Sequence, residues 1–160
     1  MSRRGAQEGS LVLDRSDTDL FQLSSETAER LRPQVEAADV TLSVSGAPAV
    51  ASVDPARIGQ VLTNLLGNAL GHTATNGAVT MITKKDSEGV TVIIADDGDG
   101  IAAADLSRVF DRFYRGTTTS RAGTGIGLAI ARDIVDAHGG QIAATSNGQG
   151  TGATFTVRLP

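Results

Sequence analysis

The stretch NLLGNALGHT, residues 64–73, completes a long helical pattern around which the rest of the chain is organised. Upstream of it, Asp54 and Pro55 are the N-cap acid and first-position proline that typically start a helix. Between this start and the break at residues 71–77, apolar residues recur at helical spacing. They are Ile58, Val61, Leu62, Leu65, Leu66 and Ala69. The pattern predicts a helix with one face buried in the core.

Two asparagines flank that apolar face. Asn64 and Asn68 lie four residues apart, so their side chains are neighbours on the helix surface. A carboxamide oxygen is a neutral, hard ligand that suits Mg²⁺ already carrying phosphate charge. The simpler alternative is a pair of amides that are solvated or that cap a neighbouring loop.

The remaining apolar runs predict the other elements. Helices and strands alternate, but strands also follow strands directly, which is typical of an α/β sandwich (α+β) with helices on one face of a mixed sheet. Segments 40–44 and 49–53 are expected to pair with each other, and 78–83 and 90–96 to form a hairpin. Pro33 disturbs the last turns of the first helix. We expect helices at 18–38, 102–110 and 125–138, and strands at 11–13, 40–44, 49–53, 78–83, 90–96, 141–146 and 153–159.

Length and composition narrow the function classes. The 160 residues suit one domain at 11–160 after a disordered lead-in at 1–10. A net charge of −4 and only 3% aromatic residues argue against nucleic-acid binding. The absence of cysteine excludes disulfides and thiolate chemistry and fits a reducing compartment, and the two histidines lack the spacing of a zinc site. No stretch approaches the ~20 apolar residues of a membrane span, so we expect a cytoplasmic chain without direct membrane contact.

The stretch DDGDGI, residues 96–101, follows a strongly apolar predicted strand. A carboxylate at the end of a strand can accept a hydrogen bond from an exocyclic amine, and the glycines admit a flat ring. Asp97 is favoured over Asp96 as that acceptor, because it directly precedes Gly98 and stands closer to Gly100. The alternative is an acid and two glycines that only form a turn.

The stretch GTGIGLAIA, residues 123–131, places three glycines at the start of a predicted helix. Each glycine costs about 1 kcal/mol relative to alanine in a helix, so a function such as close approach of a phosphate to the backbone must offset it. Taken alone, a glycine turn before a core helix is the simpler interpretation. A Walker loop is excluded because no Lys-Ser/Thr follows the glycines, and a Rossmann fingerprint because no strand precedes them.

A fourth stretch, FDRFYR at residues 110–115, holds three of the five aromatic residues of the chain. Phe110 and Phe113 are expected to anchor the core or a lid rather than to form stacking platforms. Arg112 and Arg115 contact either phosphates or solvent.

In this order and spacing, the four stretches resemble the ATP-binding catalytic domain of two-component sensor histidine kinases, within the superfamily that includes DNA gyrase and MutL. They correspond to its N box, first glycine box, F box and second glycine box. DAHGGQI at 136–142 and GTGATFTVRLP at 150–160 match the ending of the family. The resemblance implies a Bergerat fold, in which three helices back a mixed sheet of about five main strands and a lid lies between the F box and the second glycine box.

The resemblance also implies a site for ATP and Mg²⁺. Asn68 is similar to the metal ligand of the family, with Asn64 in support. The resemblance implies that both are catalytic residues. Asp97 corresponds to the acid that reads the adenine amino group, and His72 to a residue that stacks on adenine. The other implied nucleotide-binding residues are Gly98, Gly100, Ile101, Arg112, Tyr114, Gly123, Gly125, Gly127, Leu128 and Thr154.

Departures from the family pattern qualify the expected function. Gly71 replaces the usual lysine of the N box, so we expect weak ATP binding. No phosphoacceptor pattern such as H-E-L-R-T-P occurs, so the γ-phosphate is expected to go to a histidine on a separate helical-hairpin domain, and onward to a response regulator. Asn64 stands where serine kinases and ATPases of the superfamily carry a glutamate base. An anti-sigma-factor serine kinase and a degenerate nucleotide-binding module remain alternatives. The isolated chain is expected to be a monomer.

Overall fold

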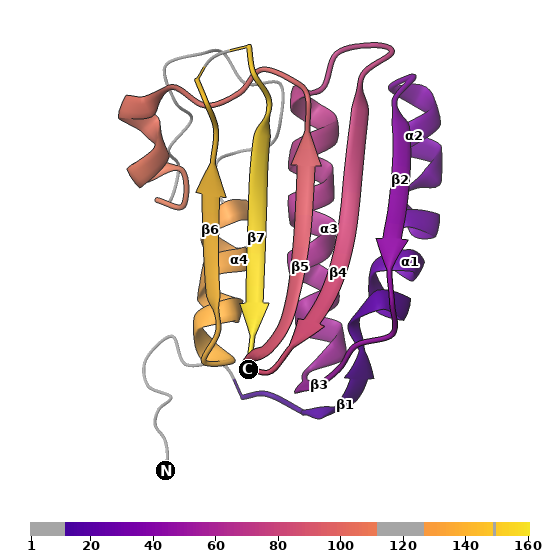
Figure 1. Cartoon of the computed structure of the whole chain (residues 1–160), viewed down its shortest axis with the longest axis vertical. Helices are drawn as coiled ribbons and strands as arrows, with labels where there is room; N and C mark the ends of the chain where they lie inside the picture. The colour runs from indigo at the N-terminus through magenta and orange to yellow at the C-terminus, as the bar shows by residue number, and fades with distance from the viewer. Residues whose placement is uncertain (1–11, 112–126, 149) are drawn as a thin grey trace.

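The computed structural model describes residues 12–111, 127–148 and 150–160. It has two layers, a five-stranded sheet and a set of helices packed on one of its faces (Figure 1). This confirms the predicted α/β sandwich. The lead-in at residues 1–10 lies outside the described part of the chain.

The main sheet is mixed and follows the order β2-β4-β5-β7-β6. β2 is parallel to β4, and every other neighbouring pair is antiparallel. The predicted hairpin is confirmed as β4 and β5, which meet from Val79 opposite Asp96 to Asp86 opposite Gly89. The strands are β2 (Thr41–Gly46), β4 (Ala78–Asp86), β5 (Gly89–Asp96), β6 (Gln141–Thr145) and β7 (Ala153–Leu159).

The helices cover one face of this sheet and bury the core against it (Figure 1). α1 (Leu20–Arg30), α3 (Pro55–His72) and α4 (Gly127–Ala137) are the three main ones, and α2 (Arg32–Ala37) continues α1. All six apolar positions predicted for α3 are buried. Alternate residues of the strands face the helices, including Val92 and Ile94 of β5 and Phe155 and Val157 of β7.

The start of α3 is fixed by a buried hydrogen-bond network. The Asp54 carboxylate accepts hydrogen bonds from the Ala56 and Arg57 N–H groups at 3.1 and 3.2 Å, which makes it the predicted N-cap. The Asp54 N–H donates to Nε2 of His138 at 3.0 Å, and Nδ1 of His138 lies 2.8 Å from the Ile134 carbonyl oxygen. His138 is therefore a structural residue that joins the end of α4 to the start of α3.

Two strand predictions are wrong. Segment 49–53 does not pair with 40–44: β3 (Val50–Val53) pairs antiparallel with β1 (Ser16–Asp19) in a separate two-stranded sheet, and β2 pairs with β4. The Asp19 carboxylate accepts the Ala49 N–H at 3.0 Å and so holds the start of β3 beside β1. Residue 11 of the strand expected at 11–13 lies outside the described residues, and residues 12 and 13 belong to no strand; Val12 is 88% exposed.

The predicted helices also differ in detail. Residues 18 and 19 of the helix expected at 18–38 belong to β1. The rest of the segment divides at Leu31 into α1 and α2, because Pro33 has no N–H to continue the first helix and instead occupies the first turn of the second. Segment 102–110 contains a 3₁₀-helix, η1 (Ala103–Arg108), rather than an α-helix. The last predicted helix is confirmed as α4 from residue 127 onward.

Candidate functional site

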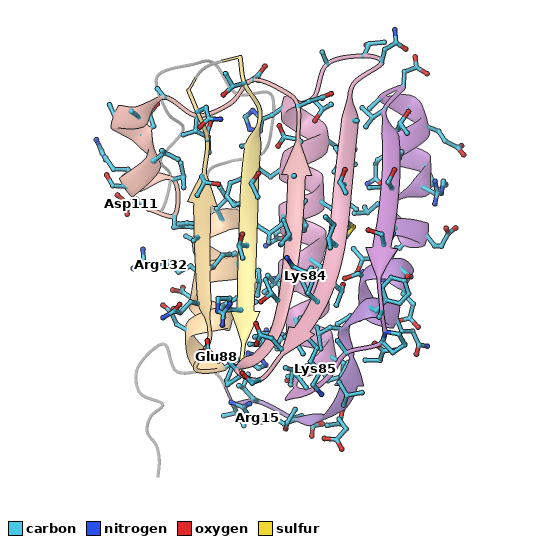
Figure 2. The ribbon with its side chains drawn as sticks, in the orientation of Figure 1. Arg15, Lys84, Lys85, Glu88, Asp111 and Arg132 are labelled. Carbon is cyan, nitrogen blue, oxygen red and sulfur yellow. The ribbon has the colours of Figure 1, made fainter. Side chains whose placement is uncertain are left out.

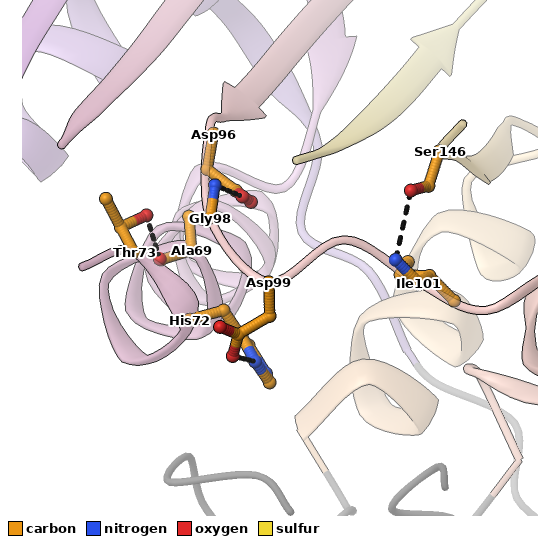
Figure 3. A network of polar contacts seen from close by, with 8 residues as sticks. All are labelled: Ala69, His72, Thr73, Asp96, Gly98, Asp99, Ile101 and Ser146. Atoms are coloured by element: carbon orange, nitrogen blue, oxygen red, sulfur yellow. Dashed lines mark hydrogen bonds and ion pairs between the residues drawn. The ribbon is translucent and has the colours of Figure 1, made fainter. Parts of the chain in front are cut away.

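The carboxyl end of β5 leads into a loop, residues 97–101, that packs against the last turn of α3. The Asp99 N–H donates to the His72 carbonyl oxygen at 3.0 Å, and Asp99 Oδ2 lies 3.2 Å from Nδ1 of His72 (Figure 3). A Cβ atom at Gly98 would collide with the same carbonyl oxygen. Glycine is therefore required here by the close approach of two backbones, whatever binds nearby.

Asp96 ends β5 on the face that packs against the helices. It continues the alternation of Val92 and Ile94, and its Oδ1 accepts the Gly98 N–H at 2.9 Å (Figure 3). Burial raises the pKa of Asp96, although the Gly98 and Ala153 N–H groups act in the opposite direction. The carboxylate is thus partly desolvated and positioned by backbone donors.

Asp97 has a different environment from Asp96. Its side chain is exposed, and Oδ1 accepts the Ala78 N–H at 3.0 Å, which supports the start of β4. The geometry therefore favours Asp96 over Asp97 as the acid of a binding site, contrary to the preference drawn from the sequence. The signal that was missed is the period of two in β5, which assigns Asp96 to the buried face.

The Thr154 side chain lies on the opposite face of the sheet from the Asp96 side chain. The β5–β7 register pairs Thr154 with Ala95 and Ala153 with Asp96. Because side chains alternate along a strand, the Thr154 side chain lies on the sheet face away from the helices. The structure does not bring this hydroxyl together with the Asp96 carboxylate.

Asn64 of α3 lies beside the start of α4. The Asn64 Nδ2 donates to the Gly127 carbonyl oxygen at 3.0 Å, and half-buried Asn68 follows one turn later. A Cβ atom at Gly127 would meet the Asn64 side chain at ordinary contact distance, 3.8 Å, so this contact does not itself demand glycine. The structure therefore joins the N-box helix to the first turn of the second glycine-box helix.

Apolar residues complete the described part of the site. Ile101 and Leu128 are partly buried and pack against the core. Phe110 also packs there, with its ring edge-on to Phe155 at a centroid distance of 6.0 Å, which confirms it as a core anchor. Gly100 adopts φ +72°, and a Cβ atom there would collide with the Gly148 carbonyl oxygen.

Several predicted site residues lie outside the described residues. They are Arg112, Phe113, Tyr114, Arg115, Gly123 and Gly125, together with the lid segment 116–122.

The lysines of the chain are remote from this site. Lys84 and Lys85 are its only two, and both belong to the end of β4 that leads into the β4–β5 turn. Figure 2 shows Arg15, Lys85 and Glu88 at the end of the sheet opposite to Asp96. Arg15 and Lys85 donate there to carbonyl oxygens of β3, at 3.0 and 3.2 Å. No lysine is thus available to compensate for Gly71.

The side-chain oxygens of this site suit a metal ion that is held mainly by the phosphates of a bound molecule. Within residues 12–111, 127–148 and 150–160, no group of three or more His, Cys, Asp or Glu side chains could hold a metal ion. The carboxamides of Asn64 and Asn68 are neutral oxygen donors, and such a set fits Mg²⁺ when phosphates supply the negative charge. No helix in the described part of the chain is long and apolar enough to span a bilayer.

Comparisons with known proteins identify the family and the fold. The family of histidine kinase-, DNA gyrase B-, and HSP90-like ATPases matches residues 53–160. The probable sensor protein PcoS of Escherichia coli is 35% identical over 157 residues, which cover 96% of this chain but 33% of PcoS. This chain thus spans about a third of that relative.

Two solved structures share the fold. Full-length ShkA in complex with AMPPNP superposes with a TM-score of 0.81 at 26% identity, covering 94% of this chain and 32% of ShkA. Histidine kinase ThkA in complex with the response regulator protein TrrA superposes with a TM-score of 0.79 at 25% identity, covering 93% of this chain and 42% of that one. The chain therefore belongs to the histidine kinase-, DNA gyrase B-, and HSP90-like ATPase family, as an ATP-binding catalytic domain of the sensor histidine kinase type.

Proposed function

We propose that this domain binds Mg·ATP between α3, the 97–101 loop and the start of α4, and donates the γ-phosphate to a histidine on a separate helical-hairpin domain. A response regulator then receives the phosphoryl group. The observation that carries the proposal is the half-buried Asp96 carboxylate at the start of the 97–101 loop. This loop is hydrogen-bonded to the last turn of α3, the helix that carries Asn64 and Asn68. The AMPPNP bound to ShkA and the regulator bound to ThkA support the two halves of the proposal.

The adenine end of the site rests on hydrogen bonding and shape. Asp96 accepts a hydrogen bond from the exocyclic amine of adenine, and Ile101 and Leu128 provide apolar contact with the ring. Guanine presents a carbonyl oxygen where adenine has the amine, so the Asp96 carboxylate disfavours it. Neither Asp97 nor Thr154 is part of the adenine site in this proposal, because of the positions of their side chains.

The phosphate end uses α3 and α4. The carboxamide oxygens of Asn68 and Asn64 hold Mg²⁺, and N–H groups in the first turn of α4, next to Gly127, bind phosphate oxygens. When bound, the metal neutralises charge on the phosphates. Asn64 cannot accept a proton, but a neutral imidazole is already nucleophilic near pH 7 and needs no base from this domain. The proposal places this reaction in the cytoplasm.

Paired asparagine substitutions test the adenine assignment. Asp96→Asn should weaken ATP binding by about tenfold or more, because an amide presents a donor as well as an acceptor to the base. Asp97→Asn is the matched control and should bind ATP like the unmodified protein. Both affinities are measured by calorimetry with Mg²⁺, for ATP and for GTP. If the unmodified protein binds ATP and GTP alike, or neither, the adenine site is refuted.

Phosphotransfer in trans tests the reaction. With labelled ATP alone the domain should stay unlabelled, and an added helical-hairpin phosphoacceptor chain should acquire the label. Asn68→Ala should stop this transfer. Phosphohistidine is lost in acid, so acid-stable label on the partner would favour an anti-sigma-factor serine kinase instead. Binding of ATP without any transfer would leave a nucleotide-binding module.

A further inference from the structure

We propose that Ser146 is a positioning residue that holds the 97–101 loop in its adenine-binding conformation; this inference rests on the proposed function. Ser146 directly follows β6 and lies about 45 residues beyond the loop in sequence. Its hydroxyl oxygen accepts the Ile101 N–H at 3.0 Å (Figure 3) and the Gly148 N–H at 3.2 Å. Its proton is donated to the Gly152 carbonyl oxygen at 2.7 Å, and the Gly148 carbonyl oxygen lies farther away at 3.2 Å.

The loop depends on such distant partners. Residues 97–101 form neither a helix nor a strand, so their backbone groups need partners elsewhere. Three come from the β6–β7 connection: Ser146 to Ile101, the Gly150 N–H to the Asp99 carbonyl oxygen at 2.6 Å, and the Gly152 N–H to the Gly98 carbonyl oxygen at 3.1 Å. The connection therefore holds one side of the loop, while the last turn of α3 holds the other.

The Ser146 hydroxyl also forms hydrogen bonds within the β6–β7 connection, in addition to its bond to the 97–101 loop. One hydroxyl joins Ile101, Gly148 and Gly152, so it fixes the distance between the loop, the turn and the start of β7. Gly152 packs so closely on the Asp96 carbonyl that a Cβ atom there would collide with it. Removal of the hydroxyl releases the loop on the Ile101 side and loosens the segment that supports Asp96.

The consequence is confined to the adenine end of the site. The carboxamides of Asn64 and Asn68, and the first turn of α4, make none of these contacts with Ser146. Loss of the hydroxyl should therefore weaken recognition of the base and leave binding of the phosphates and metal unchanged. A side chain with only a general structural role would not separate these two effects.

The experiment compares Ser146→Ala with Ser146→Thr, which keeps a hydroxyl, and with Thr145→Ala, which removes the exposed hydroxyl next to it. Binding of ATP and of tripolyphosphate is measured with Mg²⁺, and amide hydrogen exchange at Ile101 without nucleotide. Ser146→Ala should bind ATP about tenfold more weakly, bind tripolyphosphate normally and exchange the Ile101 amide faster. Ser146→Thr should restore ATP binding to within about threefold, and Thr145→Ala should match the unmodified protein.

Three outcomes of the binding measurements would overturn the inference: unchanged ATP affinity in Ser146→Ala, an equal loss for ATP and tripolyphosphate, or no rescue by Ser146→Thr. The inference would also be overturned if the Ile101 amide exchanged no faster in Ser146→Ala than in the unmodified protein, and this measurement needs no nucleotide. This last measurement separates the two proposals. If the unmodified protein fails to bind ATP, the proposed function fails, while the exchange data still test the contact of Ser146 with the loop.

Discussion

Asp54→Ala should destabilise the protein through the start of α3. The Asp54 carboxylate accepts hydrogen bonds from three backbone N–H groups, those of Ala56 and Arg57 in the helix and that of Asp14, at 3.0 Å, before the first strand. The substitution removes both acceptor oxygens and therefore all three hydrogen bonds. It keeps the backbone N–H that donates to His138, so its effect isolates the carboxylate.

The magnitude follows from these contacts. Loss of an N-cap acid costs about 1 kcal/mol, and loss of the charge-assisted bond from Asp14 adds a similar amount. The expected total is about 2 kcal/mol, or about 4 to 8 °C in the melting temperature for a domain of this size.

The effect should depend on pH with a definite sign. The hydrogen bond from the Asp14 N–H, reinforced by those from Arg57 and Ala56, holds the pKa of the Asp54 carboxyl below its ordinary value despite burial. The folded protein therefore keeps this carboxylate ionised to lower pH than the unfolded chain does. Its stabilisation is complete above a pH of about 4 and is lost as the pH falls through the lowered pKa.

Urea unfolding followed by circular dichroism, at pH 7 and in steps down to pH 3, measures both quantities. Asp17→Ala removes an exposed carboxylate in β1 and is the matched control, expected to change the unfolding free energy by less than about 0.5 kcal/mol. A loss below about 0.5 kcal/mol for Asp54→Ala at pH 7 would refute the capping argument. A loss that stays constant below pH 4 would refute the role of the charge.

Three further predictions follow from buried polar groups. His138 is only 2% exposed, and His138→Leu removes the acceptor of the buried Asp54 N–H. This substitution should lower the free energy of unfolding, measured in urea, by about 2 kcal/mol. Ser24→Ala should raise the unfolding free energy by about 1 kcal/mol, because the Ser24 hydroxyl is buried without a partner among the described residues. Ser25→Ala, the control, removes a hydroxyl that donates to the Phe21 carbonyl oxygen at 3.0 Å and should not stabilise. ATP affinity, measured by calorimetry, should fall as the pH is lowered and Asp96 becomes protonated. Because burial raises the pKa of Asp96, this fall should begin at a higher pH than that at which an ordinary aspartate titrates.

The sequence alone determined the elements whose signals are local. The start of α3 is specified by Asp54 and Pro55, and its buried face by the spacing of six apolar residues, so both were predicted and confirmed. The hairpin of β4 and β5 was found for the same reason, since two apolar runs flank a polar turn. The order of motifs also identified the family, because it is a property of the sequence that can be compared without the fold.

Only the tertiary structure decided which strands pair and which side chains converge. The pairing of β3 with β1 depends on Asp19, 30 residues before the Ala49 N–H that it accepts, and no local pattern encodes that contact. The choice between Asp96 and Asp97 depends on which sheet face each side chain occupies, and one residue of shift reverses that face. Ser146 reaches Ile101 across 45 residues of chain, so its role became visible only when folding placed the two loops side by side.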